Sequence, residues 1–540
     1  MQLICVDEQS FAKIRAQSGI YVDKTQHLYN IFKTGTYFFI SRPRRFGKSL
    51  LCSTIAELFA GNRELFKNTW IDQSDWNWQE HPVIRLDMTK AAGASSDAAI
   101  VRQGMLNLIN DNATQLGIVD LAQTSPHLML AQLINKLHLK NGKGVVVVID
   151  EYDKPLLDTV DDSNRYKDIH RELASFYGQL KASSDQLRLV FLTGVFKFAQ
   201  TSIFSGLNNL NDLTFNPKAA EMLGYTEQEI KTYFAEHLDA LAKKDSVSTD
   251  AMLDTLRQQY NGYRFGVDLM TEKLSSRVYN PFGLNYVFKE QQLMSQWFSS
   301  GSPSALIKKL SEQGFQAIET KNMIMDFSTL KNSCGPDNMD PVMLLYYAGY
   351  TTIKSFERTT PGDGEVVLGF PNMETGLSFS KLLLPLITKT DDNAMRNANK
   401  ELRKIVLANN LDALKDCMNH LLAQLPYELH GKQGKTEKED LVLREHYYQT
   451  VFYLWLTAAG FLTTPEDMTN RGRIDLTVLL PNTVYIFELK MDQPAAAAIQ
   501  QIKDRDYATK YRTPGRHIVG VGITLNVKDR CVDELLYEIL

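Results

Sequence analysis

Short apolar runs and helical periodicity alternate through the first part of the chain. Apolar runs occupy residues 37–40, 83–86, 145–149 and 188–192, and apolar residues recur at helical spacing in 50–59 and 98–137. The run from Val145 to Ile149 is too continuous for a strand with one exposed face, so we expect it to be buried in a parallel sheet. Strands separated by helices predict an α/β domain over residues 1–215.

The middle of the chain, residues 216–384, changes pattern twice. From Glu221 to about Met294 the pattern is mostly helical, with a turn-rich insert around Asn261-Gly262-Tyr263, which predicts a helical lid or a small subdomain. Residues 339–372 predict a helix and two strands joined by the turn Pro361-Gly362-Asp363-Gly364, a wing-like hairpin. This region contains no recognisable chemical motif.

The last part of the chain, residues 385–540, predicts a third domain. Residues 376–428 are helical in pattern, and the polar segment from Gly431 to Asp440 is the best linker candidate. The elements expected beyond it are a helix at 441–461, strands at 473–480 and 483–490, a helix at 494–511 and a strand at 517–523.

Composition restricts the class of protein. Of 540 residues, 44% are hydrophobic and 23% are charged, which excludes a disordered or low-complexity chain. The 59 Lys and Arg residues and 63 Asp and Glu residues give a net charge of −4, so any nucleic-acid surface must be a local one.

Cysteine usage and hydropathy indicate the compartment. The five cysteines form no CxxC pair, so neither a disulfide framework nor a zinc site is indicated. Asp7 and Glu8 stand where a signal peptide would be apolar, and no run reaches the roughly 18 apolar residues of a membrane span. We expect a cytoplasmic protein with no membrane partner.

A phosphate-binding loop is indicated between the first strand and the next helix. Gly47, Lys48 and Ser49 match the end of the pattern GxxxxGK[ST], in which backbone N–H groups cradle phosphates, Lys contacts them and the hydroxyl holds Mg²⁺. Arg42 replaces the first glycine. The arginines at 42, 44 and 45 either contact phosphates, complete a neighbouring subunit's site, or form a solvated basic loop.

Two carboxylates follow the buried strand. Asp150 at its end suits Mg²⁺ ligation through water, and Glu151 suits orientation or deprotonation of the attacking water. The alternative is a pair of structural carboxylates at a strand exit. Thr193 ends the next strand and is either a γ-phosphate sensor or a turn residue.

The sequence motifs resemble those of the bacterial AAA-ATPase-like family, whose loop lacks the first glycine. The resemblance lies in YVDKT at 21–25, SRPRRFGKSL at 41–50, VVVVIDEYDKPL at 145–156 and LTGVFKFAQTSIFSGLNNL at 192–210, and it spans residues 1 to about 225. It implies a P-loop NTPase fold and ATP binding despite Arg42. The nucleotide-binding residues are then Arg45, Phe46, Gly47, Lys48, Ser49, Leu50, Asp150 and Thr193, with Ser49 and Asp150 at Mg²⁺ and Glu151 catalytic.

A second site is indicated on the predicted hairpin near the C-terminus. Glu488 and Lys490 project from the same face because strand side chains alternate, and Asp475 on the paired strand can join them. Two carboxylates can hold Mg²⁺ or Mn²⁺ against a phosphodiester, and Lys can orient water or stabilise developing charge. A charged hairpin without catalytic function has the same pattern.

Residues on either side of the hairpin favour the catalytic interpretation. Glu445 lies at the start of an apolar helix face, where it is either a metal-site carboxylate or an N-terminal helix charge. A basic segment follows the hairpin and suits a polyanionic substrate, unless it is a solvated helix face. Its cations are Lys503, Arg505, Lys510, Arg512 and Arg516.

Residues 385–530 resemble the PD-(D/E)xK nuclease family that is commonly fused to this ATPase. The resemblance implies a restriction-endonuclease-like α/β fold with Glu445, Asp475, Glu488 and Lys490 as the active site, where Asp475 and Glu488 are the metal ligands. Gln501 and Tyr507 are implied as supporting residues, although their spacing of six differs from QxxxY. Ile474 replaces the family's Pro, which ligates nothing.

These patterns together predict an ATPase that controls or powers a Mg²⁺-dependent endo- or exonuclease, with DNA preferred over RNA. Phage defence or DNA processing is the expected setting, and homo-oligomerisation is an open possibility. The alternative is a nucleotide-dependent signalling switch or scaffold whose C-terminal domain binds nucleic acid or protein without cleavage.

Overall fold

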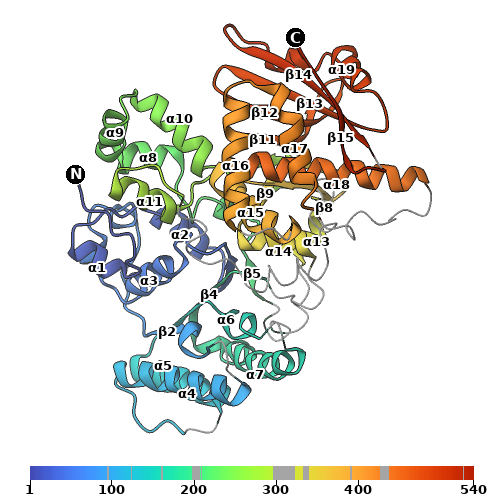
Figure 1. Cartoon of the computed structure of the whole chain (residues 1–540). Helices are drawn as coiled ribbons and strands as arrows, with labels where there is room; N and C mark the ends of the chain where they lie inside the picture. Colours follow the sequence, from blue (N-terminus) through green and yellow to red (C-terminus); the bar gives the residue numbers. More distant parts are fainter. Residues whose placement is uncertain are drawn as a thin grey trace. The chain divides into compact units, whose positions relative to one another are not determined.

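A computed structural model describes the chain except for a set of short segments and one longer one. The described residues are 1–93, 97–122, 125–159, 162–197, 203, 207, 209–295, 323–332, 340–388, 392–425, 437–526 and 528–540. The chain forms two compact units (Figure 1). Unit 1 comprises Met1–Ile307 with Ile324–Asn372, and unit 2 comprises Lys308–Met323 with Met373–Leu540. The three-domain division stays a prediction, and most of the predicted linker lies outside the described residues.

Unit 1 is built on a five-stranded parallel sheet with the order β2-β3-β4-β1-β5. The strands are β1 (Tyr37–Ser41), β2 (Val83–Asp87), β3 (Val145–Asp150), β4 (Leu187–Gly194) and β5 (Asn211–Asp212). Val145 to Ile149 are all buried, as their unbroken apolar run predicts. Asp87 pairs with Asp150, and Ile40 pairs with Thr193, so the strand ends that carry polar residues meet at one edge.

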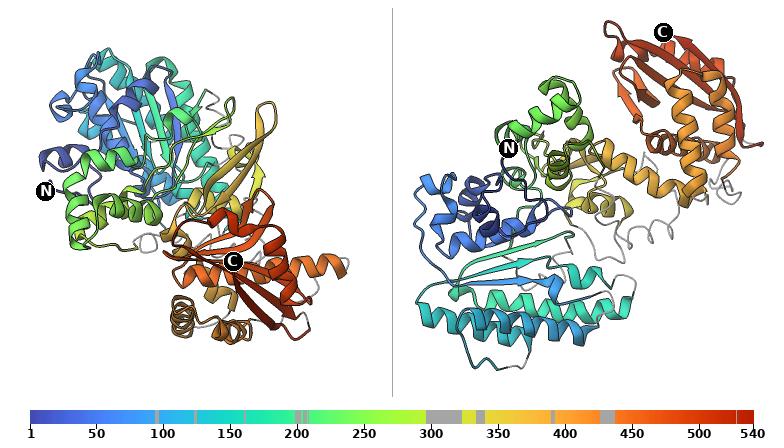
Figure 2. Two further views of the ribbon diagram at one scale, coloured as in Figure 1. Left: turned by 90° about the horizontal axis from the view of Figure 1, so that it is seen from above. Right: turned by 60° about the vertical axis from the view of Figure 1, so that its left-hand side comes forward.

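Helices separate these strands. They are α1 (Phe11–Ala16), α2 (Thr25–Phe32), α3 (Lys48–Phe59), α4 (Ala98–Gln115), α5 (Pro126–Asn141), α6 (Lys154–Leu157) and α7 (Ser163–Ala182). In the right-hand view of Figure 2, α4, α5 and α7 form one layer below the sheet. The segment 98–137 is divided into two helices, and Pro126 occupies the first turn of the second one, α5.

The expected lid is a cluster of four helices, α8 (Glu227–Tyr233), α9 (Ala235–Lys244), α10 (Thr249–Tyr260) and α11 (Pro281–Glu290). Phe234 stacks on Phe288, and Leu241, Leu256 and Leu284 are fully buried around them. Between α10 and α11 the chain forms an antiparallel ribbon from the Tyr263↔Val278 bridge to β6 (Val267–Asp268) and β7 (Lys273–Leu274). We call residues 263–278 the ribbon.

The rest of unit 1 contains the expected helix and hairpin. Its elements are β8 (Ile324–Asp326), α13 (Phe327–Lys331), α14 (Pro341–Ala348), β9 (Thr352–Thr360) and β10 (Asp363–Gly369), with the sheet order β8-β10-β9. Pro341 to Tyr347 of α14 are all buried, so this helix belongs to the core of the region. The first strand, β8, was not expected from the sequence.

Unit 2 begins with the helices α15 (Met373–Thr388), α16 (Asp392–Leu407), α17 (Leu414–Leu422) and α18 (Glu437–Ala458). A sheet of order β11-β12-β13-β14-β15 follows, parallel only between β13 and β14. Its elements are β11 (Leu462–Thr469), β12 (Gly472–Leu479), β13 (Thr483–Met491), α19 (Ala495–Asp504), β14 (His517–Asn526) and β15 (Cys531–Ile539). The expected helix at 494–511 ends at Asp504, because Asp506 takes a left-handed conformation with φ 48°.

The two faces of this sheet have different neighbours. Ala498 and Ile499 of α19 pack over Gly522 of β14, which pairs with Glu488, so α19 covers the face from which Glu488 projects. Tyr485 projects from the other face and its hydroxyl donates to the carbonyl of Val406 on α16 (3.3 Å). Among the described helices of the whole chain, none has the length and apolar character needed to cross a membrane.

Candidate nucleotide and nuclease sites

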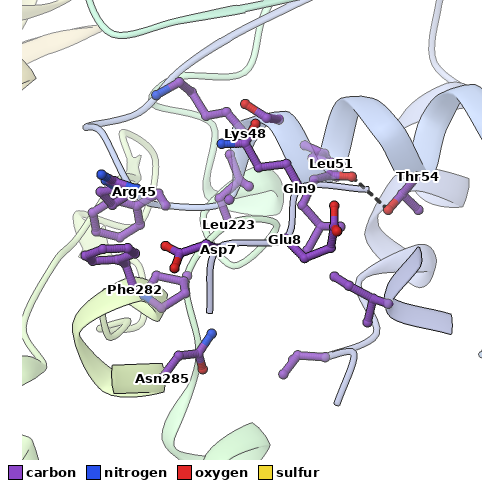
Figure 3. A pocket seen from close by; sticks show the side chains of 18 of the residues that line it. Asp7, Glu8, Gln9, Arg45, Lys48, Leu51, Thr54, Leu223, Phe282 and Asn285 are labelled. Atoms are coloured by element: carbon purple, nitrogen blue, oxygen red, sulfur yellow. Dashed lines mark hydrogen bonds between the residues drawn. The ribbon is translucent and has the colours of Figure 1, made fainter. Parts of the chain in front are cut away.

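Unit 1 contains a cavity of about 560 Å³ where β1, β2 and β3 end, a size typical of small-molecule sites. The cavity is lined by the phosphate loop, the segment after β3, the N-terminal segment at residues 5–9 and the start of α11. Figure 3 shows Arg45, Phe282 and Asp7 on one side of this cavity and Lys48 between that side and Thr54. The expected residues that line it are Arg45, Phe46, Gly47, Lys48, Ser49, Leu50, Asp150 and Glu151.

The phosphate loop has the backbone that its motif requires. Gly47 precedes α3 with φ 91°, a left-handed conformation that glycine adopts without strain, and Arg45 also has positive φ, at 68°. The first N–H groups of α3 and the positive end of its dipole therefore face the cavity, which is favourable for an anion. Lys48 Nζ donates to the carbonyls of Arg42 (3.1 Å) and Pro43 (3.2 Å).

Arg42, which replaces the first glycine, is a structural residue and not a phosphate ligand. Its side chain is 1% exposed and donates to the carbonyls of Thr214 (2.8 Å) and Ala219 (3.2 Å). The guanidinium also lies 4.2 Å from the ring centre of Phe265 on the ribbon. None of the three roles considered for it from the sequence is the one observed, because the cation anchors the loop to the segment after β5.

The other two arginines differ from Arg42. Arg44 and Arg45 line the cavity, and the Arg45 guanidinium lies 4.1 Å from the ring centre of Phe282 on α11. Phe46 turns away from this side, is 1% exposed and packs edge-on against Tyr263 (4.9 Å) and Phe265 (5.2 Å). Its side chain therefore fixes the loop, while Arg45 closes the cavity against the helical cluster.

The carboxylates after β3 lie close to the loop. Burial raises the pKa of Asp150 to about 6, although a hydrogen bond with Ser49 opposes the shift. Glu151 Oε1 lies 3.4 Å from Lys48 Nζ, and Glu151 has a positive φ of 51°. The structure thus brings Ser49, Asp150, Glu151 and Lys48 together.

Thr193 lies elsewhere. It is fully buried in β4, and among the described residues its hydroxyl has no hydrogen-bond partner. It does not line the cavity. The sensor role therefore stays a prediction that would require Thr193 to become accessible.

Sequence reasoning missed three residues of this region. Asp87 ends β2, pairs with Asp150 and contributes to the raised pKa of Asp150. The signal that could have found it was an acid at the end of a short strand candidate. Asp153 is fully buried and accepts from the amides of Val195 (3.0 Å) and Phe196 (2.7 Å), which links the β3 and β4 ends. Phe282 had no sequence signal.

The second site lies in unit 2, where β12 and β13 face α19. Glu488 is 1% exposed, and its Oε1 accepts from Lys490 Nζ (3.0 Å) and from Gln501 Nε2. Its other oxygen, Oε2, is buried and has no partner among the described residues. Asp475 Oδ2 accepts from the amide of Leu489 (2.7 Å), which holds this carboxylate across the strand pair beside Glu488.

The two supporting residues meet the same carboxylate. Gln501 on α19 donates to Glu488 and is also hydrogen-bonded to Tyr507, whose hydroxyl donates to the Arg473 carbonyl (2.7 Å). The left-handed residue Asp506 places Tyr507 beside Gln501 even though the two are six residues apart.

Glu445 lies on α18 near the other carboxylates. Burial raises the pKa of Glu445 above its ordinary value. The Lys490 cation opposes this shift, and the charge of Glu466 adds to it. Gln449, one turn further along α18, donates to Glu466 Oε1 (2.8 Å) and to the Asp475 carbonyl (2.8 Å). Gln449 and Glu466 were not found from the sequence, although Gln449 follows Glu445 at helical spacing.

The charges of this site are strongly coupled. Burial raises the pKa of Glu488 to about 7, and burial with the Glu488 charge raises the pKa of Asp475. Burial favours a neutral Lys490, but the surrounding carboxylates raise its pKa above the ordinary value. Lys490 is therefore a cation at neutral pH.

Both regions match known families. Residues 6–204 match the family described as "Predicted AAA-ATPase", and residues 443–535 match the PD-(D/E)XK nuclease superfamily. A protein of Azotobacter chroococcum mcd 1, described as "Uncharacterized protein in vnfD 5'region", is 34% identical over 538 residues, which cover 98% of each chain. The chain belongs to the AAA-ATPase-like family. Its C-terminal domain belongs to the PD-(D/E)XK nuclease superfamily, so both resemblances seen in the sequence are confirmed.

The carboxylates of the nuclease-superfamily domain are suited to bind a divalent cation. Within the described ranges, no group of three or more His, Cys, Asp or Glu side chains is arranged to hold a metal ion. The buried Oε2 of Glu488 nevertheless has no partner among the described residues, and the raised pKa values of Asp475 and Glu488 show that added positive charge would favour the joint ionisation of both carboxyl groups. Asp475 and Glu488 are the residues that would hold the ion.

The basic segment beside this site is largely paired with acids. Lys503 lies 2.7 Å from Glu538, Lys510 pairs with Asp467, and Arg512 lies 3.9 Å from Asp506. These contacts reduce the positive charge that the nuclease-superfamily domain offers to a substrate along this segment.

Proposed function

We propose that this member of the AAA-ATPase-like family hydrolyses ATP and cuts DNA in the cytoplasm with a divalent cation. The Glu488 carboxylate carries the proposal, since one oxygen is fixed by Lys490 and Gln501 while the other is buried without a partner. An unmet buried acceptor costs about 1–3 kcal/mol, so a ligand that satisfies Oε2 would offset a cost that the fold alone leaves in place.

In the ATPase domain the chain supplies positioning and charge. The N-terminal amides of α3 and Lys48 would bind the phosphates, and Ser49 and Asp150 would hold Mg²⁺, which neutralises phosphate charge when bound. The hydrogen bond between Ser49 and Asp150 already joins these two ligands. Glu151 would accept a proton from the attacking water, once the phosphates compete with its carboxylate for Lys48.

In the nuclease domain Asp475 and Glu488 would hold the metal ion, which polarises the phosphodiester when bound. Gln501 fixes the Glu488 side chain, and Tyr507 fixes Gln501. Because Lys490 is protonated, it would stabilise negative charge that develops on the phosphate or orient water, and it is unsuited to act as a base.

The test uses the purified full chain with plasmid DNA, linear DNA and RNA, each with and without Mg²⁺ and ATP. Wild-type protein is expected to cut DNA only with the metal ion, and Glu488→Gln to lose cutting. The matched control is Glu538→Gln, an acid of the same domain that is 48% exposed. Metal-independent cutting, or full cutting by Glu488→Gln, would contradict the proposed site.

The alternative, a switch or scaffold without cleavage, gives a different result in this assay. ATP turnover with no cutting of any substrate under any metal condition would favour it. Binding of Mn²⁺ by wild-type protein and not by Glu488→Gln, measured by calorimetry, would still support the metal site independently of cutting.

A further inference from the structure

Three cations gather on the outer side of the ribbon in unit 1. Tyr263 and Val278 form an antiparallel bridge, so the next residue on each side, Arg264 and Arg277, face each other on the opposite face of the ribbon. Lys354 of β9 lies beside them, because Arg264 Nη1 donates to its carbonyl (3.2 Å). We call Arg264, Arg277 and Lys354 the basic triad.

The basic triad is electrostatically unfavourable without a partner. Like charges directly opposite each other on paired strands are destabilising. None of the three forms an ion pair with any carboxylate in the described part of the chain, and Arg264 Nε is buried without a hydrogen-bond partner.

The nearest acid on this face of the ribbon does not compensate the charge. Asp268 pairs with Lys273 in the strand register, and its Oδ1 accepts from the amides of Met270 (2.9 Å) and Thr271 (3.2 Å). Its carboxylate therefore stabilises the turn at the end of the ribbon.

We propose that the basic triad binds the phosphate backbone of nucleic acid, which gives the ATPase unit its own contact with the polymer. Arg277 and Lys354 are exposed on a strand surface and do not line the nucleotide cavity, which suits an extended polyanion. The identity of the polyanion rests on the proposed function, because a chain that acts on nucleic acid meets that polymer. Contacts to the backbone do not discriminate between base sequences.

The experiment measures binding of fluorescent duplex DNA by the full chain in EDTA, where no metal-dependent cutting occurs. Arg264→Gln/Arg277→Gln/Lys354→Gln is compared with a control of equal charge change, Lys167→Gln/Arg171→Gln/Lys243→Gln, whose residues are exposed on α7 and α9. The triad variant is expected to bind about tenfold or more weakly for every sequence, and its salt slope to fall by roughly 2–3.

A second variant covers the case in which loss of Arg264 disturbs folding. Arg277→Gln/Lys354→Gln changes only exposed side chains and should lose roughly 2 from the salt slope while basal ATP turnover stays at the wild-type rate. Wild-type affinity and salt slope in both variants would overturn the inference. The inference would also be overturned if the triad variants lost binding to polyglutamate and kept wild-type DNA binding. That result would indicate an acidic protein partner. The binding result does not depend on nuclease activity, because the assay in EDTA measures binding without cutting.

Discussion

The side chains of Lys48 and Glu151 form an ion pair in the nucleotide cavity, with 3.4 Å between Nζ and Oε1. The cation expected to bind phosphate is therefore held by the carboxylate expected to activate water. ATP phosphates would take over Lys48 and release Glu151, so phosphate binding and the availability of the base are linked.

Glu151→Gln should separate ATP binding from hydrolysis. The amide cannot accept the proton of water, so turnover should fall by about 10²–10⁴, and ATP should bind at least as tightly because Lys48 has lost a competing anion. Turnover is followed by phosphate release and affinity by a fluorescent ATP analogue. Glu64→Gln, a carboxylate that is 81% exposed, should behave as wild type. Normal turnover in Glu151→Gln would show that Glu151 is not the base.

Lys48→Ala should abolish ATP binding or turnover, because phosphate loses its main cation. If nucleotide binds two states of the chain with different affinity, the same change should also alter DNA cutting. The rates of ATP turnover and DNA cutting are measured in Lys48→Ala and in Lys490→Ala. Lys490→Ala changes the other site and tests the coupling in the opposite direction. Unaltered cutting by Lys48→Ala at every ATP concentration would establish two independent enzymes on one chain.

Lys490→Ala should lower cutting by about 10²–10³, the usual effect of removing one charge-stabilising group, and leave ATP turnover intact. Lys503→Ala is the matched control, since this cation of the same domain is paired with Glu538 and 40% exposed. Cutting is quantified on the substrate preferred by wild type. Equal losses in the two variants would mean that the effect of Lys490 is structural.

Arg42→Gly should destabilise the protein although it restores the glycine of the general motif. The carbonyls of Thr214 and Ala219 would lose their buried donor, which costs about 3 kcal/mol or more in the free energy of unfolding. Urea unfolding measures the loss, and Arg44→Gly on the same loop should cost much less. A neutral effect of Arg42→Gly would mean that the loop does not need its anchor.

Asp153→Asn should reduce the dependence of stability on pH. Burial, with the Glu151 charge, raises the pKa of Asp153 to about 7 from 3.8, so the folded protein binds a proton that the unfolded chain releases. Wild-type stability contributed by this group is therefore present at low pH and lost as pH rises towards 7. The asparagine oxygen still accepts from Val195 and Phe196, so the variant should gain relative to wild type at pH 8.

The control for this pH effect is Asp185→Asn, an exposed acid near the start of β4. Its urea midpoints should parallel those of wild type at pH 5 and pH 8. An Asp153→Asn curve that also runs parallel to wild type would contradict the assigned proton on Asp153.

Elements with a clear local pattern of apolar and polar residues could be predicted from the sequence. The unbroken apolar run of β3 and the alternation of β12 and β13 placed Asp150, Glu488 and Lys490 at the right ends and faces of strands. Strand β11 was missed because Pro465 and the left-handed Glu466, with φ 48°, interrupt its pattern.

Long-range contacts could not be predicted in this way. The role of Arg42 depends on carbonyls more than 170 positions away, at Thr214 and Ala219. Whether Thr193 is buried or faces the nucleotide depends on how β4 lies between β1 and β3, and a single strand pattern does not contain that information.

The aromatic packing of Phe46 against Tyr263 and Phe265 joins the phosphate loop to the amide between those two rings. That amide, the N–H of Arg264, donates to the hydroxyl of Thr352 on β9 (2.7 Å). If the loop shifts when phosphate enters, the packed rings would transmit that shift to the hydrogen bond between Arg264 and Thr352. Deuterium uptake at a single backbone position outside the cavity would then report whether ATP is bound, without any label on the protein.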